Sequence, residues 1–266
     1  MRIALGLEYD GSAFRGWQSQ AGGGTVQDAL ETALAAIAGQ PLRAVCAGRT
    51  DAGVHALMQV VHFDTDVVRP ESAWVRGVNA HLPTSVAVRW AREVPAEFHA
   101  RFSATARRYR YLLLNRPERP ALLAGKVGWF HRPLDVGAMR QGAEYLKGEH
   151  DFSAFRAADC QAKSAVKVVR EISIRREGDL ICFDIEANAF LYHMVRNIVG
   201  SLVFVGKGLK PATWIDELLA ARTRSLAAPT FSPDGLYLVS ISYDSSFMLP
   251  LKSSNSQFEA WDLANV

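Results

Sequence analysis

Residues 42–65, LRAVCAGRTDAGVHALMQVVHFDT, place a glycine-bounded loop between two segments that have the composition of strands. Leu42 to Ala47 predicts the strand that enters the loop, and Met58 to Thr65 alternates like the strand that leaves it. The two glycines of the loop permit backbone angles that other residues resist, so the chain can turn sharply and approach a ligand. We therefore expect Asp51, which lies between these glycines, to be displayed outside regular structure.

The residues around this loop predict mixed helices and strands. Thr25-Val-Gln-Asp28 has the spacing of a capping box, and apolar residues then recur at helical intervals until Gly39. The other elements expected in this half are strands at 2–8 and 85–90 and a mostly helical segment at 70–82.

A second domain is expected to begin near residue 105, where the composition turns basic. In Arg108 to Leu114, alternation places Tyr109 on one face of a strand and Arg108 and Arg110 on the other. Further elements are predicted as helices at 134–147, 190–205 and 211–222 and strands at 168–174, 180–186 and 236–243.

The predicted elements favour an α+β fold, because strands outnumber the crossover helices that a fully parallel sheet requires. We expect two mixed domains, residues 1–104 and 105–244, with largely antiparallel sheets flanked by helices. The Ser-rich tail 245–266 is expected to be poorly ordered or to dock elsewhere.

Charge permits a polyanionic partner without requiring one. The formal net charge is +3, but six arginines and one acid lie between His99 and Pro120, and six Lys or Arg and two acids lie between Arg156 and Arg176. Together these stretches can form a phosphate-binding surface. The alternative is that each is a solvated face that keeps the protein soluble.

Several classes of protein are not indicated. The three cysteines lie far apart and predict reduced thiols in a cytoplasmic protein, and the seven histidines lack zinc spacing, so we expect no metal. No apolar run is long enough for a membrane span, and the start lacks the apolar core of a signal peptide. There is no P-loop, no dinucleotide fingerprint and no nucleophile elbow, so no cofactor is expected.

These absences leave a single carboxylate, Asp51, as the candidate for chemistry. A carboxylate can act as a covalent nucleophile or accept a proton, and a neighbouring guanidinium keeps it ionised and aimed. Arg49 lies two residues away. The alternative to a catalytic role is that Asp51 is an ordinary turn aspartate paired with a nearby arginine.

The loop GRTDAGVHA, residues 48–56, resembles the catalytic signature of the tRNA pseudouridine synthase A family. Other blocks match that family in order, and the resemblance covers roughly residues 2–244. The blocks are YDGSAFRGWQSQ (9–20), RRYRY (107–111), GEHDF (148–152), NAFLYHMVRN (188–197), and Ala228-Pro229 followed by Gly235-Leu236.

The resemblance implies the pseudouridine synthase fold with a basic cleft between its two domains. It also implies isomerisation of uridine to pseudouridine at positions 38 to 40 in the anticodon stem-loop of tRNA, by a homodimer that uses no metal or cofactor. Asp51 would be the catalytic carboxylate, and Tyr109 would stack on the uracil. Arg196 would pair with Asp51, and Arg49 would help to expel or replace the flipped base.

Alternatives remain at this level. Tyr109 can be a plain core aromatic. Arg196 lies in an apolar helix, where a charge is costly without a partner, and Asp51 is the partner we expect. Arg108 and Arg110 are expected to bind RNA phosphates. For the whole chain, the alternatives are a non-catalytic RNA-binding protein and, after it, a small-molecule hydrolase that uses Asp51.

Overall fold

The computed structural model describes residues 1–251 and divides the chain into two compact units. The first unit contains Met1–Thr105 and the segment that begins at Tyr237, and the second contains Ala106–Leu236. Most of the tail 245–266, whose order the sequence leaves in question, lies outside the described residues. Each unit is described by itself.

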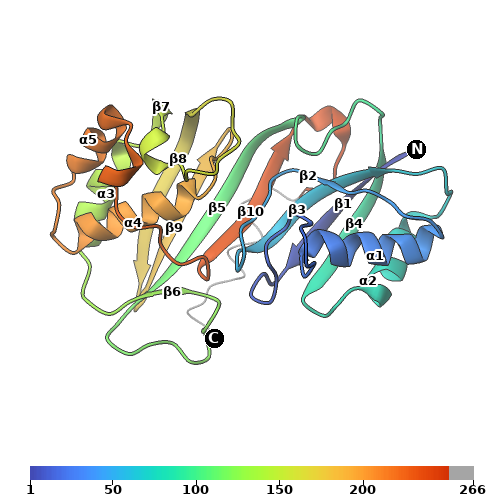
Figure 1. The fold of residues 1–266 in the computed structure, drawn as a ribbon, viewed down its shortest axis with the longest axis horizontal. Coiled ribbons are helices and arrows are strands. Elements are labelled where there is room, and N and C mark those ends of the chain that lie inside the picture. Colours follow the sequence, from blue (N-terminus) through green and yellow to red (C-terminus); the bar gives the residue numbers. More distant parts are fainter. Residues whose placement is uncertain (252–266) are drawn as a thin grey trace. The chain divides into compact units, whose positions relative to one another are not determined.

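The first unit is a sheet with helices packed beside it (Figure 1). Its strands are β1 (Arg2–Tyr9), β2 (Val45–Cys46), β3 (His55–Asp64), β4 (Val86–Val94) and β10 (Leu236–Tyr243), and its helices are α1 (Val26–Ala38) and α2 (Val78–His81), the latter preceded by a π-helical turn, Ala73–Gly77. β1 lies between β4 and β3 and is antiparallel to both, β2 pairs antiparallel with β3, and β10 runs parallel to β3.

Local signals set the ends of α1 as the sequence predicts. The Thr25 hydroxyl accepts from the backbone N–H of Asp28, and the Asp28 carboxylate accepts from the backbone of Thr25. Gly39 ends the helix with φ 72°, in the left-handed region that glycine adopts readily. The capping box and the glycine stop are therefore confirmed.

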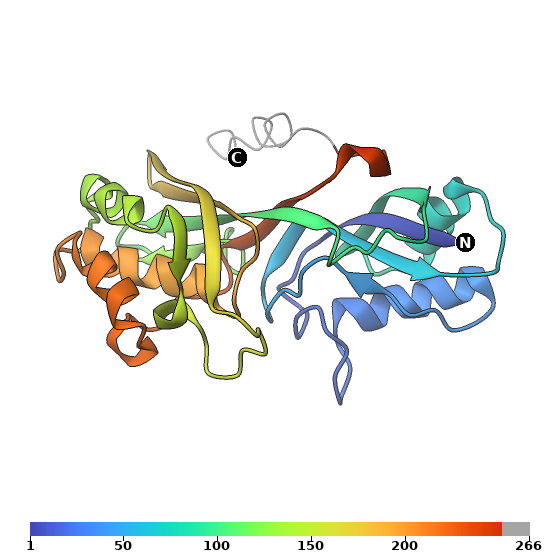
Figure 2. The ribbon, with the colours of Figure 1, turned by 90° about the horizontal axis from the view of Figure 1, so that it is seen from above.

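The second unit is a four-strand antiparallel ladder with a helical layer. Its order is β5 (Ala104–Asn115), β9 (Leu180–Ala187), β8 (Val166–Glu177) and β7 (Gly148–Asp151), and β6 (Gly128–Phe130) pairs parallel with β5. The helices α3 (Val136–Glu144), α4 (Met194–Gly206) and α5 (Trp214–Ala221) contact one another, and α3 also contacts β8. These three helices lie together in Figure 2, viewed from above.

Three expectations differ from the structure. Only Val45–Cys46 of the expected strand at 42–47 is strand. The helix expected from Phe190 begins instead at Met194, because His193 is left-handed with φ 61° and the chain before it turns. The last strand is expected in the C-terminal domain, but from Tyr237 it belongs to the first unit, where Tyr237 and Leu238 pair with His55 and Ala56.

Candidate active site

The Asp51 loop connects β2 to β3 in the first unit. The two strands pair at Val45–His62 and Cys46–Val61, and the N–H of Ala47 continues the ladder to the carbonyl of Val60 at 2.8 Å. The loop then closes on itself, because the N–H of Val54 donates to the carbonyl of Asp51 at 3.1 Å. Gly53 takes φ 80° in this turn, which explains the glycine at that position.

A second loop, residues 10–18, packs its backbone on the Asp51 loop. The N–H of Trp17 donates to the carbonyl of Thr50 at 2.9 Å, and that of Gly53 donates to the carbonyl of Phe14 at 3.4 Å. Gly16 has φ 88°, and a Cβ built there would lie 2.8 Å from the Thr50 carbonyl oxygen and 3.1 Å from the Asp51 carbonyl carbon. The close approach of the two loops therefore requires glycine at position 16.

Hydrogen bonds among buried side chains hold the Asp51 loop in place. The hydroxyls of Tyr9 and Thr50 lie 2.8 Å apart, and the Gln59 side-chain amide donates to the carbonyl of Gly48 at 2.7 Å. Burial raises the pKa of Tyr9 well above its ordinary value, so the phenol stays protonated at neutral pH. Sequence reasoning missed these supports, because they join positions 41 and 11 residues apart that no local pattern connects. The one signal was that Tyr9 opens a block matching the family.

Arg49 and Asp51 flank the buried Thr50. The Arg49 side chain is exposed and Asp51 is half-buried, so these two charged side chains lie on the outer side of the loop. The Thr50 side chain between them points inward and bonds to Tyr9, which holds the loop in place. Burial raises the pKa of the neighbouring Cys46 thiol to about 12, against the opposing effect of the Arg49 charge. At neutral pH Cys46 is therefore a neutral thiol and not a thiolate nucleophile. Asp51 is the acidic residue of the loop 48–56.

Tyr109 lies on β5 in the second unit, with 8% of its surface exposed. Its ring meets Phe190 edge to face, with the ring centroids 5.0 Å apart and the planes at 82°. Phe190 is itself half-buried in the turn before α4. Tyr109 is therefore held in place by an aromatic neighbour, an arrangement that suits a core position as well as a ring that stacks on a base.

Arg196 is half-buried on the first turn of α4. Its Nε donates to the carbonyl of Phe231 at 2.8 Å, and the backbone of Phe231 returns a hydrogen bond to the Arg196 carbonyl at 3.3 Å. These bonds orient the guanidinium within the second unit. The expected pairing with Asp51, a residue of the first unit, stays a prediction.

Arg108 and Arg110 project from the opposite face of β5 to Tyr109 and are engaged by carboxylates. Arg110 donates to both oxygens of Asp184 at 2.9 and 3.0 Å, and Arg175 also reaches Asp184 at 3.1 Å. Arg108 pairs with Glu171 and lies 3.7 Å from Glu186. The structure thus assigns both arginines a place in charge ladders across the sheet.

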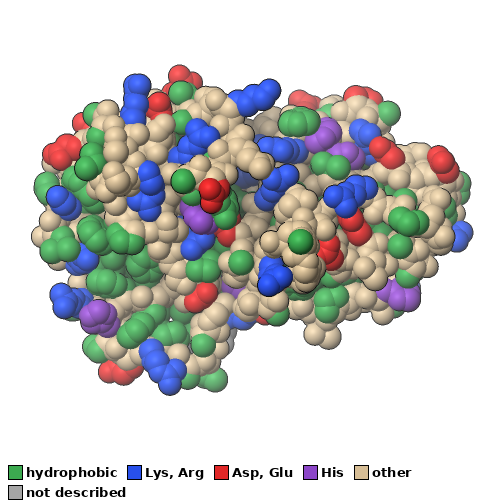
Figure 3. All heavy atoms as spheres, viewed as in Figure 1, with side chains coloured by type: hydrophobic (Ala, Val, Ile, Leu, Met, Phe, Trp, Pro, Cys, Tyr) green, Lys and Arg blue, Asp and Glu red, His purple; other side chains and the backbone are tan. Residues whose placement is uncertain are grey.

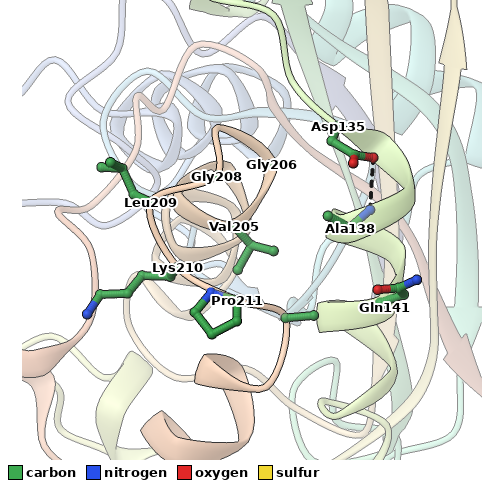
Figure 4. A pocket seen from close by; sticks show the side chains of 10 residues that line it. Asp135, Ala138, Gln141, Val205, Gly206, Gly208, Leu209, Lys210 and Pro211 are labelled. Atoms are coloured by element: carbon green, nitrogen blue, oxygen red, sulfur yellow. Dashed lines mark hydrogen bonds between the residues drawn. The ribbon is translucent and has the colours of Figure 1, made fainter.

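A hollow of about 410 Å³ lies elsewhere in the second unit, between the start of α3 and the end of α4 (Figure 4). None of the site residues predicted from the sequence lines it. The Asp135 carboxylate at its edge caps α3, accepting from the N–H of Ala138 at 3.0 Å. Because its one lining carboxylate is occupied as a helix cap, this hollow is not the candidate active site.

Metal and membrane features are absent from the described part of the chain. Within residues 1–251, no cluster of three or more His, Cys, Asp or Glu side chains has the arrangement of a metal site, and no helix is long and apolar enough to cross a membrane. On the face drawn in Figure 3, Lys and Arg side chains are spread singly and in small groups among hydrophobic ones.

Comparison with known proteins gives the family. The model described as "tRNA pseudouridine synthase" matches residues 7–103 and 143–244, which include Asp51 and Arg196 but not Tyr109. The chain is 63% identical over 250 residues to tRNA pseudouridine synthase A of Dechloromonas aromatica, covering 94% of this chain and 95% of that protein. It is 64% identical to the protein of the same name from Aromatoleum aromaticum, with the same coverage.

A third relative, tRNA pseudouridine synthase A of Thiobacillus denitrificans, is 59% identical over 258 residues, covering 97% of this chain and 99% of that protein. Identity at this level, across nearly the whole length of each protein, confirms the resemblance that the motifs indicate. The chain belongs to the tRNA pseudouridine synthase family.

Proposed function

We propose that this protein isomerises uridine to pseudouridine at positions 38 to 40 in the anticodon stem-loop of tRNA, with Asp51 as the catalytic carboxylate. The observation that supports this most is the family match across the segment that carries the Asp51 loop. The reaction breaks the N1 glycosidic bond, turns the detached uracil and rejoins it through C5. C5 gives up its proton and N1 gains one, so the composition of the nucleotide is unchanged and no redox change occurs. One carboxylate can therefore serve without metal or cofactor.

The geometry of the loop supports Asp51 in this role. A nucleotide that reacts must leave the helical stack at a cost of a few kcal/mol, and it must then meet a catalytic group that is already in place. Asp51 is half-buried on a loop tied down by Thr50, by the carbonyl of Gly48 and by the backbone of residues 14–17. A carboxylate held in this way can attack C1′ or C6, or abstract a sugar proton.

The other roles belong to the same proposal. Tyr109 stacks on the uracil, Arg196 pairs with Asp51, and the exposed Arg49 expels or replaces the flipped base. The Phe190 contact and the bond to Phe231 support fixed positions for the Tyr109 ring and the Arg196 guanidinium. We also propose that the protein acts as a cytoplasmic homodimer with tRNA as its partner.

RNA contact by Arg108 and Arg110 competes with their role in the sheet. The Arg108 guanidinium already pairs with Glu171, and the Arg110 guanidinium pairs with Asp184. A phosphate would have to share each guanidinium with its carboxylate. The salt dependence of binding decides between the two roles, because each phosphate contact that is lost lowers the slope by about 0.9.

The test of the function is incubation of the purified protein with unmodified tRNA transcripts that carry one uridine at position 38, 39 or 40. We expect pseudouridine at each of these positions and none in transcripts with cytidine there. A protein that binds the transcripts and modifies none is the non-catalytic RNA-binding alternative.

A further inference from the structure

Phe102 is the most exposed aromatic residue in the described part of the chain, with 77% of its surface accessible. It lies in the first unit, in the tight turn His99–Ser103 that precedes β5. The turn is closed from both sides, because the N–H of Ser103 donates to the carbonyl of His99 at 2.9 Å and the N–H of His99 donates to the Ser103 hydroxyl at 3.0 Å. The exposed ring is therefore carried on a fixed segment.

The ring of His99 holds Phe102 from behind. The two rings stack with centroids 4.3 Å apart and planes at 29°. The Nδ1 of His99 also accepts from the N–H groups of Arg101 and Phe102, each at 3.2 Å. Burial and the charge of Arg2 lower the pKa of His99, so its ring is neutral and can accept these bonds at neutral pH.

The support continues into the core through His62 on β3. His62 meets the edge of His99 at 4.7 Å, and its Nδ1 accepts from the N–H of Ala100 at 3.1 Å. His62 is 4% exposed, so the stack runs from the interior to Phe102 at the surface. An apolar ring that is both this exposed and this firmly held is organised for a contact before the partner arrives.

The charges near the ring point to the kind of partner. The guanidinium of Arg101 lies 5.7 Å from the Phe102 ring centroid. The N–H of Ala100, next to Arg101, bonds to His62, and His62 pairs with Val45 of β2, so this turn lies beside the strand that leads into the Asp51 loop and its exposed Arg49. A flat aromatic face beside arginines is the combination that binds unpaired nucleotides, with stacking on the base and attraction to the phosphate.

We propose that Phe102 and Arg101 form a stacking platform for an unpaired nucleobase of the RNA substrate, beside the Asp51 loop and separate from the nucleotide that reacts. The outer face of Phe102 receives the base, and Arg101 meets the adjoining phosphate. The platform carries no hydrogen-bonding group on its apolar ring, so it holds the RNA without reading its sequence. This inference rests on the proposed function, because it takes the same RNA as its ligand.

The test compares Phe102→Ala, Phe102→Leu and Phe102→Trp in the full-length protein. Val68→Ala is the matched control, since Val68 is 73% exposed in the same unit. The measurements are the Kd for unmodified tRNA, the kcat and KM for pseudouridine formation, and the thermal unfolding midpoint. We expect Phe102→Ala and Phe102→Leu to raise Kd and KM by roughly 5- to 150-fold, the range that loss of one stacked base gives.

In the same experiment Phe102→Trp retains wild-type affinity, because it restores a π face, and Val68→Ala matches the wild type. The kcat changes less than twofold in every variant, and the unfolding midpoints agree with that of the wild type. An affinity of Phe102→Ala within twofold of the wild type overturns the platform. A Kd of Phe102→Leu equal to that of Phe102→Trp also overturns the platform. If the wild type binds tRNA but forms no pseudouridine, the proposed function falls, and the Kd comparison still decides the platform.

Discussion

At the scale of the residue, the ring of Tyr109 is the part of the side chain that matters if it stacks on uracil. We expect Tyr109→Phe to keep kcat/KM within about threefold of the wild type, because both rings offer a π face. Tyr109→Ala should lower kcat/KM by roughly 5- to 150-fold. If Tyr109→Phe and Tyr109→Ala lose kcat/KM equally, the hydroxyl carries the role. If Tyr109→Ala keeps the wild-type kcat/KM, Tyr109 is only a core aromatic that packs against Phe190.

His62 links stability to pH. Burial lowers the pKa of His62 from 6.5 to about 4, so the unfolded chain takes up a proton at a higher pH than the folded chain does. The stabilisation is complete above pH 6.5 and is lost as the pH falls towards 4, by roughly 1–3 kcal/mol in the free energy of unfolding. Urea unfolding at a series of pH values measures this.

A matched variant separates His62 from the other titrating groups. His62→Gln keeps an acceptor for the N–H of Ala100 but cannot take up the proton. We expect its free energy of unfolding to depend less on pH over the same window. An identical pH dependence in the wild type and His62→Gln would show that other groups control acid unfolding.

At the scale of the element, Gly16 decides whether two loops can meet. Gly16→Ala adds a Cβ that would lie 2.8 Å from the Thr50 carbonyl oxygen, so the Asp51 loop must shift. Displacements of about 1 Å can cost on the order of 100-fold in rate, and we expect kcat/KM to fall at least about tenfold.

Gly39→Ala is the control, because Gly39 also has positive φ but a Cβ there meets nothing within 4 Å. It should lower stability by about 1 kcal/mol and leave kcat/KM unchanged. Measuring kcat/KM and urea unfolding for both variants separates the effect of backbone strain from the effect of displacing the Asp51 loop. Wild-type kinetics in Gly16→Ala would show that the position of Asp51 does not depend on this contact.

The charge ladder on β5, β9 and β8 supports the second unit. Arg110→Ala removes the bidentate partner of the buried Asp184, which keeps Arg175 and the Cys182 thiol, and we expect the free energy of unfolding to fall by roughly 1–3 kcal/mol. The control Lys147→Ala breaks an exposed pair with Glu144 and should cost less than about 1 kcal/mol. Equal effects would show that burial adds nothing to the Arg110 pair.

The same variants test whether Arg110 contacts RNA. If the slope of log Kd for tRNA against log salt concentration is lower by about 0.9 in Arg110→Ala than in the wild type, Arg110 contacts a phosphate.

At the scale of the whole molecule, local rules explain what the sequence predicts well. The capping box at Thr25 and the left-handed Gly39 set the ends of α1, and strict alternation separates Tyr109 from Arg108 and Arg110 on β5. The Asp51 loop is predictable because its glycines lie between two strand-like segments and its motif matches a family.

What the sequence does not reveal depends on contacts between distant segments. The Arg108–Glu171 and Arg110–Asp184 pairs join residues 63 and 74 positions apart, so charge counting alone suggests free cations. The late start of α4 follows from the left-handed His193, which apolar spacing cannot reveal. The last strand joins the first unit only because Tyr237 and Leu238 pair with β3.

The central claim is that the Asp51 carboxylate carries the isomerisation. Rejoining uracil through C5 expels the C5 hydrogen, so tritium at C5 of uridine in tRNA is released to water once per turnover. The most direct measurement is single-turnover tritium release by the wild type, Asp51→Asn and Asp51→Ala, with the exposed Asp66→Asn as control. We predict full release by the wild type and Asp66→Asn, and none by either Asp51 variant, with tRNA affinities within about threefold of one another. Release at a near wild-type rate by Asp51→Ala would contradict the account.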